Sequence, residues 1–216
     1  MKYIRLTYML ISLFIVFFSS PACAHPHAWI DCRVKVVFGK QGQIVALKEH
    51  WLFDTYYTEF ALHDFDANKN KKLDQDELLL LAKDNIANLK EFDYFTSVQK
   101  NGKEVTFSKV TDVNSTMEKR RIGLDFTVWL AKPLDVKTNK VDYRIYDMTY
   151  YISMVHEKEG DPISLEGEGA KDCSFKLFTP KPDIMKIKFA ANLGKNIKAP
   201  DQLGAFFAQK VSLSCP

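Results

Sequence analysis

The segment from Asp66 to Glu77 has the residue types and the spacing of a calcium-binding loop. A twelve-residue EF-hand loop takes side-chain oxygens at positions 1, 3, 5, 9 and 12 and a backbone carbonyl at position 7. The corresponding residues are Asp66, Asn68, Asn70, Asp74, Glu77 and, for the carbonyl, Lys72. A hard cation needs several oxygens from one tight turn, so we expect a calcium-type loop with a helix on each side.

Two features weaken the calcium affinity expected of this loop. Position 6, where the chain turns with positive φ, is Lys71 in place of glycine, which costs about 1–2 kcal/mol. Asn68 and Asn70 stand where aspartate is common, and three lysines lie nearby. We expect an affinity of about 10⁻⁴–10⁻³ M, as in extracellular modules, or a loop that keeps its shape without holding a metal.

The start of the chain has the pattern of a secretory signal peptide. Lys2 and Arg5 precede an apolar run, and small residues ending at Ala24 form an A-x-A-like cleavage site. We predict that residues 1–24 are removed, which leaves no transmembrane segment and places residues 25–216 in the periplasm. The alternatives are a retained anchor and lipidation at Cys23.

Cleavage would make His25 the first residue, followed closely by His27. A free amine and two imidazoles are nitrogen ligands that suit Ni, Co, Zn or Cu. Asp31 and His50 would come near them if residues 28–53 form a hairpin, so we include both as candidate metal ligands. The alternative is a solvated end of the chain that binds nothing.

Composition limits the partners and predicts the redox state. The whole chain has a net charge of +3, and removal of Lys2 and Arg5 leaves +1. Because no basic cluster stands out, nucleic acid is excluded as the expected partner. Three cysteines remain after cleavage, and an oxidising compartment favours one disulfide and one leftover thiol.

The elements that must position these residues are mostly strands. Hydrophobic alternation and turn signals such as Asn101-Gly102 predict strands, and 3.6-residue spacing predicts helices around the loop. The expected strands are 28–38, 43–53, 92–100, 103–110, 121–131, 141–154, 172–178 and 211–215. We therefore predict a single α+β domain: a mainly antiparallel, sandwich-like β domain with an EF-hand-like helix–loop–helix inserted at 55–90. A C-terminal helix is expected to begin near Pro200.

Several segments together resemble a known family. They are HPHAWID at 25–31, EHWLFD at 49–54, the loop at 66–77, YFT at 94–96, YDMTYY at 146–151 and the ending from Leu203 to Pro216. The chain resembles uncharacterised bacterial periplasmic proteins described as the periplasmic component of an ABC-type transport system, often encoded beside nickel/cobalt-type permeases. The resemblance implies a membrane metal permease as partner, a Cys173–Cys215 disulfide and Cys32 as the free thiol. It departs at Asn70-Lys71, where the family usually carries Asp-Gly.

Asp147 lies in a tyrosine-rich cluster and is a further candidate. It is interpreted as an oxygen ligand for a metal, as the partner that orients an imidazole, or as the cap of a turn.

The expected function is that of a non-enzymatic, metal-binding accessory protein of a nickel, cobalt or zinc transport system, with a weak or structural calcium loop. One alternative is a copper-dependent secreted oxidoreductase, whose N-terminal His would need His50 or His156 as a second ligand. Another is a non-catalytic docking partner of a membrane permease. No Ser-His-Asp, Cys-His or paired-carboxylate arrangement stands out that would favour an enzyme.

Overall fold

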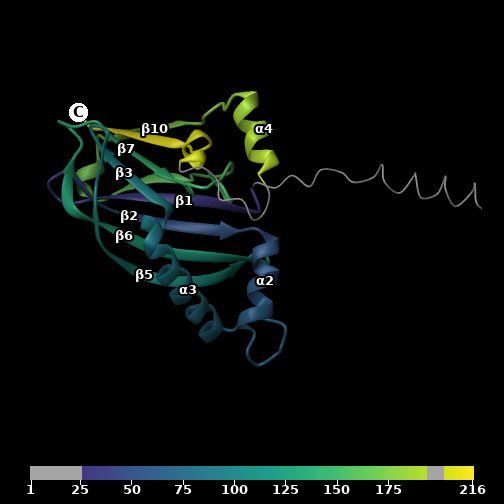
Figure 1. Cartoon of the computed structure of the whole chain (residues 1–216). Coiled ribbons are helices and arrows are strands. Elements are labelled where there is room, and N and C mark those ends of the chain that lie inside the picture. The colour runs from purple at the N-terminus through teal and green to yellow at the C-terminus, as the bar shows by residue number, and fades with distance from the viewer. Residues whose placement is uncertain (1–25, 194–201) are drawn as a thin grey trace, which may run out of the picture.

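The computed structural model describes residues 26–193 and 202–216, and in this part of the chain two β-sheets enclose one core (Figure 1). The predicted signal peptide and His25 lie outside the described residues. The sheets are mainly antiparallel and are accompanied by a helix–loop–helix and a third short helix. The predicted α+β fold class is therefore confirmed.

The larger sheet is built on the predicted hairpin. Its two strands pair antiparallel, with Asp31 opposite Leu52 and Arg33 opposite His50. In spatial order the sheet consists of β5 (Phe107–Glu118), β6 (Arg121–Asp135), β2 (Gln43–Phe53), β1 (Ala28–Phe38) and β8 (Ile152–His156), and β9 (Ile163–Glu166) also pairs with β1. β8 and β9 both run parallel to β1.

The smaller sheet gathers strands from distant parts of the chain. In spatial order it consists of β10 (Ser174–Phe178), β11 (Lys210–Ser214), β7 (Val141–Ile145), β3 (Thr96–Lys100) and β4 (Lys103–Glu104). Asn101 and Gly102 connect β3 to β4 and both have positive φ, as the predicted hairpin turn requires. The last strand therefore lies inside the sheet, between β10 and β7.

The core lies between the sheets because each central strand turns alternate residues inward. In β1 the buried positions are Ile30, Cys32, Val34, Val36 and Phe38, while the residues between them are more exposed. Apolar residues of both sheets meet in one cluster, which also takes in Leu78, Leu81 and Ala82 of the second helix. Burial of this apolar surface is the main favourable term in folding.

The predicted insertion consists of α2 (Thr55–Phe65) and α3 (Gln75–Leu89). The Asp54 side chain accepts a hydrogen bond from the Tyr57 amide and so caps α2. α3 packs along β5, and the loop between the two helices projects away from the sheets (Figure 1).

Several sequence predictions differ from the structure. The strand expected at 103–110 is divided into β4 and the start of β5, which belong to different sheets. Residues 92–95, expected to begin the strand 92–100, instead belong to a 3₁₀ turn at Lys90–Phe95, in which Asp93, Tyr94 and Phe95 all have positive φ. The strand expected at 141–154 is broken by a turn between β7 and β8. The expected start of the C-terminal helix near Pro200 lies outside the described residues, and the described part is a four-residue 3₁₀ turn at Leu203–Phe206. α4 (Ile184–Asn192) forms in a segment for which no helix was predicted.

Candidate functional site

The loop from Asp66 to Glu77 is held between the two helices by its own side chains. Asp66 ends α2, and Asp74 and Glu77 form a capping box at the start of α3. One Glu77 carboxyl oxygen accepts from the Asp74 amide and the other from the Ala67 amide, both at 2.9 Å. Glu77 therefore ties the two ends of the loop together.

The remaining candidate ligands turn toward the centre of the loop. The Asp66 carboxylate accepts the amides of Asn70 and Lys71 at 3.0 and 2.8 Å. The side-chain amides of Asn68 and Asn70 both donate to Oδ2 of Asp74, at 2.7 and 2.9 Å. The Asp74 carboxylate, which a bound cation would neutralise, therefore accepts hydrogen bonds from two side-chain amides.

The backbone takes the conformation that the EF-hand pattern demands. Lys71, at position 6, has φ +63°, and Lys69 has φ +60°. The expected left-handed conformation at position 6 is thus confirmed, even though the residue is not glycine. The Lys72 amide donates a hydrogen bond of 2.8 Å to Oδ1 of Asn70.

The donor set suits a hard cation, but its groups are at present engaged with one another. Three carboxylates, two amide oxygens and a carbonyl are oxygen ligands of the kind calcium takes. Within residues 26–193 and 202–216, no three His, Cys, Asp or Glu side chains are arranged to hold a metal ion, and this includes the loop. A cation would have to displace the hydrogen bonds from Asn68 and Asn70 to Asp74.

Among the described residues, the candidate ligands His27, Asp31 and His50 are not assembled into one site. The His27 amide donates to the Tyr151 carbonyl at 2.8 Å, and the two rings lie 4.5 Å apart. Asp31 forms an ion pair of 2.8 Å with Arg121, whose guanidinium also donates to two backbone carbonyls at the end of β2. His50 lies on the same face of the sheet as Asp31, diagonally across the hairpin.

His50 is enclosed by charged side chains that sequence reasoning missed. Its Nδ1 lies 2.8 Å from Oδ1 of Asp125, and its Nε2 lies 2.8 Å from the guanidinium of Arg33 and 3.4 Å from a Glu118 oxygen. Arg33 also pairs with Glu118 at 2.6 Å and Glu157 at 3.2 Å. Arg33, His50, Glu118 and Asp125 line a shallow depression of about 570 Å³ on the outer face of the larger sheet.

Arg33 therefore occupies the position in which a metal ion at His50 would be expected. Its guanidinium already neutralises two carboxylates and donates to the imidazole, so the protein supplies its own cation there. The signal for this cluster was present in the sequence, because alternation in the hairpin places Arg33 and His50 on the same face.

Asp147 is used to form the turn between β7 and β8. Its carboxylate accepts from the Thr149 amide and hydroxyl, both at 2.8 Å, and from the Ile152 amide at 3.0 Å. A side chain added at Gly204 would lie 1.8 Å from the Asp147 carbonyl oxygen, so the C-terminal 3₁₀ turn packs directly on this loop. Of the three roles considered for Asp147, the structure shows the turn cap.

Two buried acid–base groups lie in the core. Glu49, 2% exposed, accepts hydrogen bonds of 2.9 Å from Trp51 and Thr96, and burial raises its pKa to about 8. His156, predicted as a surface residue or as a copper ligand, is buried and contacts Tyr143 and Gln209 at 3.2 and 3.0 Å. Burial lowers the His156 pKa, so its neutral form is favoured.

The cysteines take the arrangement implied by the family resemblance. Cys173 and Cys215 form a disulfide, and Cys32 is a buried free thiol. Burial raises the Cys32 pKa well above its ordinary value, which makes it a poor nucleophile. The disulfide fits a protein from an oxidising compartment. Among the described residues, no helix is long and apolar enough to cross a membrane.

Comparison with known proteins places most of the chain in one family. A family model described as "Protein of unknown function (DUF1007)" matches residues 10–215. An uncharacterised protein of Haemophilus influenzae is 28% identical over 211 residues, which cover 96% of this chain and 97% of that protein. An uncharacterised 15.5 kDa protein of Spirochaeta aurantia is 34% identical over 103 residues, which cover 48% of this chain and 72% of that protein.

Proposed function

From the premise that this chain belongs to the DUF1007 family, we propose that it is an exported, non-catalytic, cation-binding accessory protein of a transition-metal transport system. In this role the loop at 66–77 binds calcium weakly and orders the helix–loop–helix. The transport partner is a membrane permease, as the resemblance to periplasmic transport components implies. The observation that carries the cation-binding part is the inward convergence of Asp66, Asn68, Asn70 and Asp74.

The loop supports calcium rather than a softer metal. Its ligands are oxygens, and it contains neither histidine nor cysteine, which zinc, nickel and copper prefer. The side-chain amides of Asn68 and Asn70 both donate to Asp74, so calcium would have to displace these two hydrogen bonds. Calcium would replace these weak links with shorter bonds to the same carboxylate.

The transition-metal part of the proposal rests on the beginning of the mature chain. His27 lies beside Tyr151 at the end of the larger sheet, and His25 precedes it by two residues. Because Arg33 already occupies the space around His50, we place any transition metal at His25 and His27 and not at His50. A terminal amine and two imidazoles are suitable ligands for nickel or copper.

The test is isothermal titration calorimetry of the purified mature protein with Ca²⁺ and, in a separate experiment, with Ni²⁺. We expect Ca²⁺ binding with a dissociation constant of about 10⁻⁴–10⁻³ M. Asp66→Asn should abolish it, whereas Asp64→Asn, two residues earlier on α2 and outside the ligand set, should not. Ni²⁺ binding should be lost in His27→Ala and retained in His63→Ala, since His63 is an exposed residue of α2.

Either half of the proposal can fail separately. Calcium binding that survives Asp66→Asn would remove the loop from the proposal. Nickel binding that is unchanged in His27→Ala, or absent from a protein whose first residue is verified as His25, would remove the histidine terminus. In that case a docking role without a transition metal would be the better account.

A further inference from the structure

Helix α4 exposes an unusual amount of apolar surface. Ile184, Met185, Ile187 and Phe189 are between 45% and 72% exposed, and Phe206 beside the helix is 49% exposed. We call these five residues the apolar patch. Monomeric proteins rarely leave such residues clustered on the surface, and a patch of this kind typically marks an interaction site.

The helix is nevertheless firmly attached to the domain. Of its nine residues, Ala190 is buried, and it packs with Leu193 and Leu203 in a small cluster that Tyr150 and Phe207 complete. Asp183 caps the helix by accepting from the Lys186 amide. The exposed apolar side chains therefore belong to a formed helix that is anchored along one narrow side.

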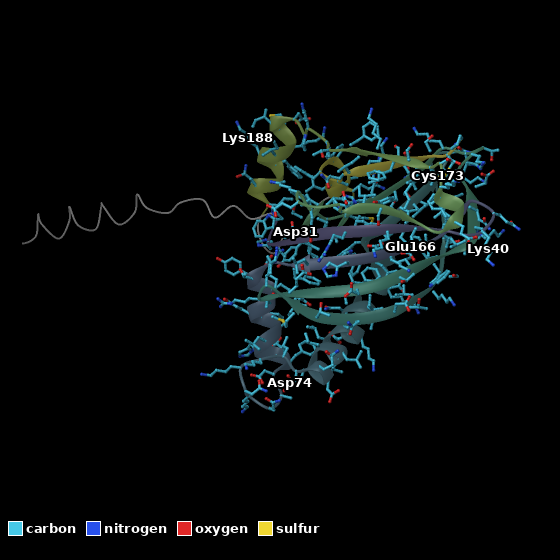
Figure 2. All side chains as sticks on the ribbon, turned by 180° about the vertical axis from the view of Figure 1, so that it is seen from behind. Asp31, Lys40, Asp74, Glu166, Cys173 and Lys188 are labelled. Carbon is cyan, nitrogen blue, oxygen red and sulfur yellow. A yellow bond between two sulfur atoms is a disulfide. The ribbon has the colours of Figure 1, made fainter. Side chains whose placement is uncertain are left out.

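Lysines lie around the apolar patch and within it. Lys186 lies 4.4 Å above the ring of Phe206 and pairs with Asp183 at 2.8 Å. Lys188 and Lys181 are exposed, and Figure 2 shows Lys188 on α4 at the end of the molecule opposite Asp74. The near-neutral charge of the whole chain conceals this feature, because residues 171–198 contain seven lysines and two aspartates. Because the mature chain has a net charge of +1, its residues outside 171–198 must be net negative.

We propose that α4 and the apolar patch dock on the surface of an anionic lipid bilayer. A helix with exposed Ile, Met and Phe side chains among lysines has the composition of an interfacial helix. Its apolar side chains would enter the boundary between headgroups and acyl chains. The lysines would attract acidic headgroups, each contributing about 1 kcal/mol near such a surface.

The shape of the patch favours lipid over a protein partner. On the helical wheel, Ile184 and Ile187 lie on one side of Lys188, while Met185 and Phe189 lie on the other, so the apolar residues form a convex ridge with a lysine at its crest. A protein would need a deep groove with a buried acid to receive this ridge. A bilayer surface yields to it, and Lys188 can extend its ammonium group to the headgroups while its stem stays among the acyl chains.

This inference deepens the proposed function and relies on it for the membrane that the exported chain would meet. The turn between β7 and β8 connects the two features, because Tyr150 packs on Phe207 in the α4 cluster while Tyr151 contacts His27. α4 and the beginning of β1 consequently lie at the same end of the molecule (Figure 1). Docking through α4 would place the histidine terminus near the membrane, where a permease would be found.

The test is sedimentation of the mature protein with extruded vesicles. One set contains phosphatidylglycerol and phosphatidylethanolamine, and the other contains phosphatidylcholine alone. We expect binding to the first set that weakens by about ten-fold or more as salt rises from 0.05 to 0.5 M, because surface charges are screened. The Ile184→Ser/Met185→Ser double variant should lose about ten-fold in affinity, and Lys181→Gln/Lys188→Gln should lose the preference for acidic lipid.

A matched control is Phe60→Ser/Leu80→Ser, which changes two apolar residues of similar exposure on α2 and α3. It should bind vesicles as the unmodified protein does, and all variants should keep the same thermal midpoint. No sedimentation with acidic vesicles, or equal loss in the control, would overturn the proposal. Retention only on membranes that contain protein would assign the patch to a protein partner. Each result leaves the calcium and nickel titrations unchanged, so the two proposals fail separately.

Discussion

The indole nitrogen of Trp51 donates a hydrogen bond of 2.9 Å to a carboxyl oxygen of Glu49 in the core between the two sheets. The other oxygen of Glu49 accepts from the Thr96 hydroxyl at 2.9 Å, and Thr96 belongs to the smaller sheet. One buried carboxyl group thus joins the two sheets. Burial raises its pKa to about 8, so its proton is retained at neutral pH.

We predict that stability falls as pH rises through the neutral range. The pKa of Glu49 is near 4.5 in the unfolded chain and about 8 in the folded chain, so between these values the folded state binds the extra proton. The free energy of unfolding should therefore decrease by up to about 1.4 kcal/mol per pH unit in this window and level off above pH 8. Urea unfolding at several pH values measures the slope.

Glu49→Gln should remove most of this slope. Glutamine can accept from Trp51 and donate to Thr96, because the Thr96 hydroxyl can give its proton to the Tyr94 carbonyl, 2.9 Å away. The variant should be more stable than the unmodified protein at pH 9. A slope that persists in Glu49→Gln would show that another group is responsible.

Lys71→Gly should stabilise the helix–loop–helix and strengthen calcium binding. Lys71 has φ +63°, and glycine removes the penalty of about 1 kcal/mol that a side chain carries there. We expect a rise of about 2–4 °C in the thermal midpoint and a several-fold lower calcium dissociation constant. Lys72→Gly, at a position without positive φ, is the control and should be neutral or destabilising.

Breaking the Cys173–Cys215 disulfide should destabilise the protein by about 4 kcal/mol, the entropy expected for closing a loop of this size. The two cysteines are 42 residues apart in the sequence. The measurement compares unfolding of the Cys173→Ser/Cys215→Ser variant with that of the unmodified protein. Dithiothreitol should lower the stability of the unmodified protein and have no effect on the double variant, since Cys32 remains a thiol in both.

Arg33→Ala should create a cation site where none is expected in the unmodified protein. Removal of the guanidinium leaves the Glu118 and Glu157 carboxylates and the His50 imidazole without their shared partner. We expect Zn²⁺ to raise the thermal midpoint of the variant and not that of Lys35→Ala, which removes a neighbouring cation from the same strand. A Zn²⁺ response that remains in Arg33→Ala/Glu118→Ala would place the new site elsewhere.

Sequence reasoning succeeded where structure depends on neighbouring residues. Alternation gave β1 and β2 with the bounds observed, and Asn101-Gly102 gave the next hairpin, because these signals are local. It failed at Asp93–Phe95, where three residues that are not glycine take positive φ. The residue types at these positions do not indicate a positive φ, which persists only where the surrounding structure imposes it.

In the candidate site, too, local features were predictable from the sequence and contacts between distant segments were not. The positions of the candidate ligands in the loop and the left-handed Lys71 follow from a twelve-residue pattern, whereas the partners of His50 come from β1, β5 and β6 and depend on sheet order. Glu49 could have been found, since it alternates in phase with the buried Leu47 and Trp51. α4 was missed because the prolines and lysines before it suggested a loop, although Asp183 is a good helix cap.

The position of β11 in the smaller sheet has a consequence for the order in which the sheet and the disulfide can form. This strand contains residues 210–214 and lies between β10 and β7, so β10 is not joined to the rest of the smaller sheet until these residues are in place. A polypeptide threaded across a membrane from its N-terminus would therefore hold an incomplete smaller sheet until residues 210–214 have crossed. The Cys173–Cys215 disulfide would then form only after β11 has been translocated, and it would link the segments that carry β10 and β11.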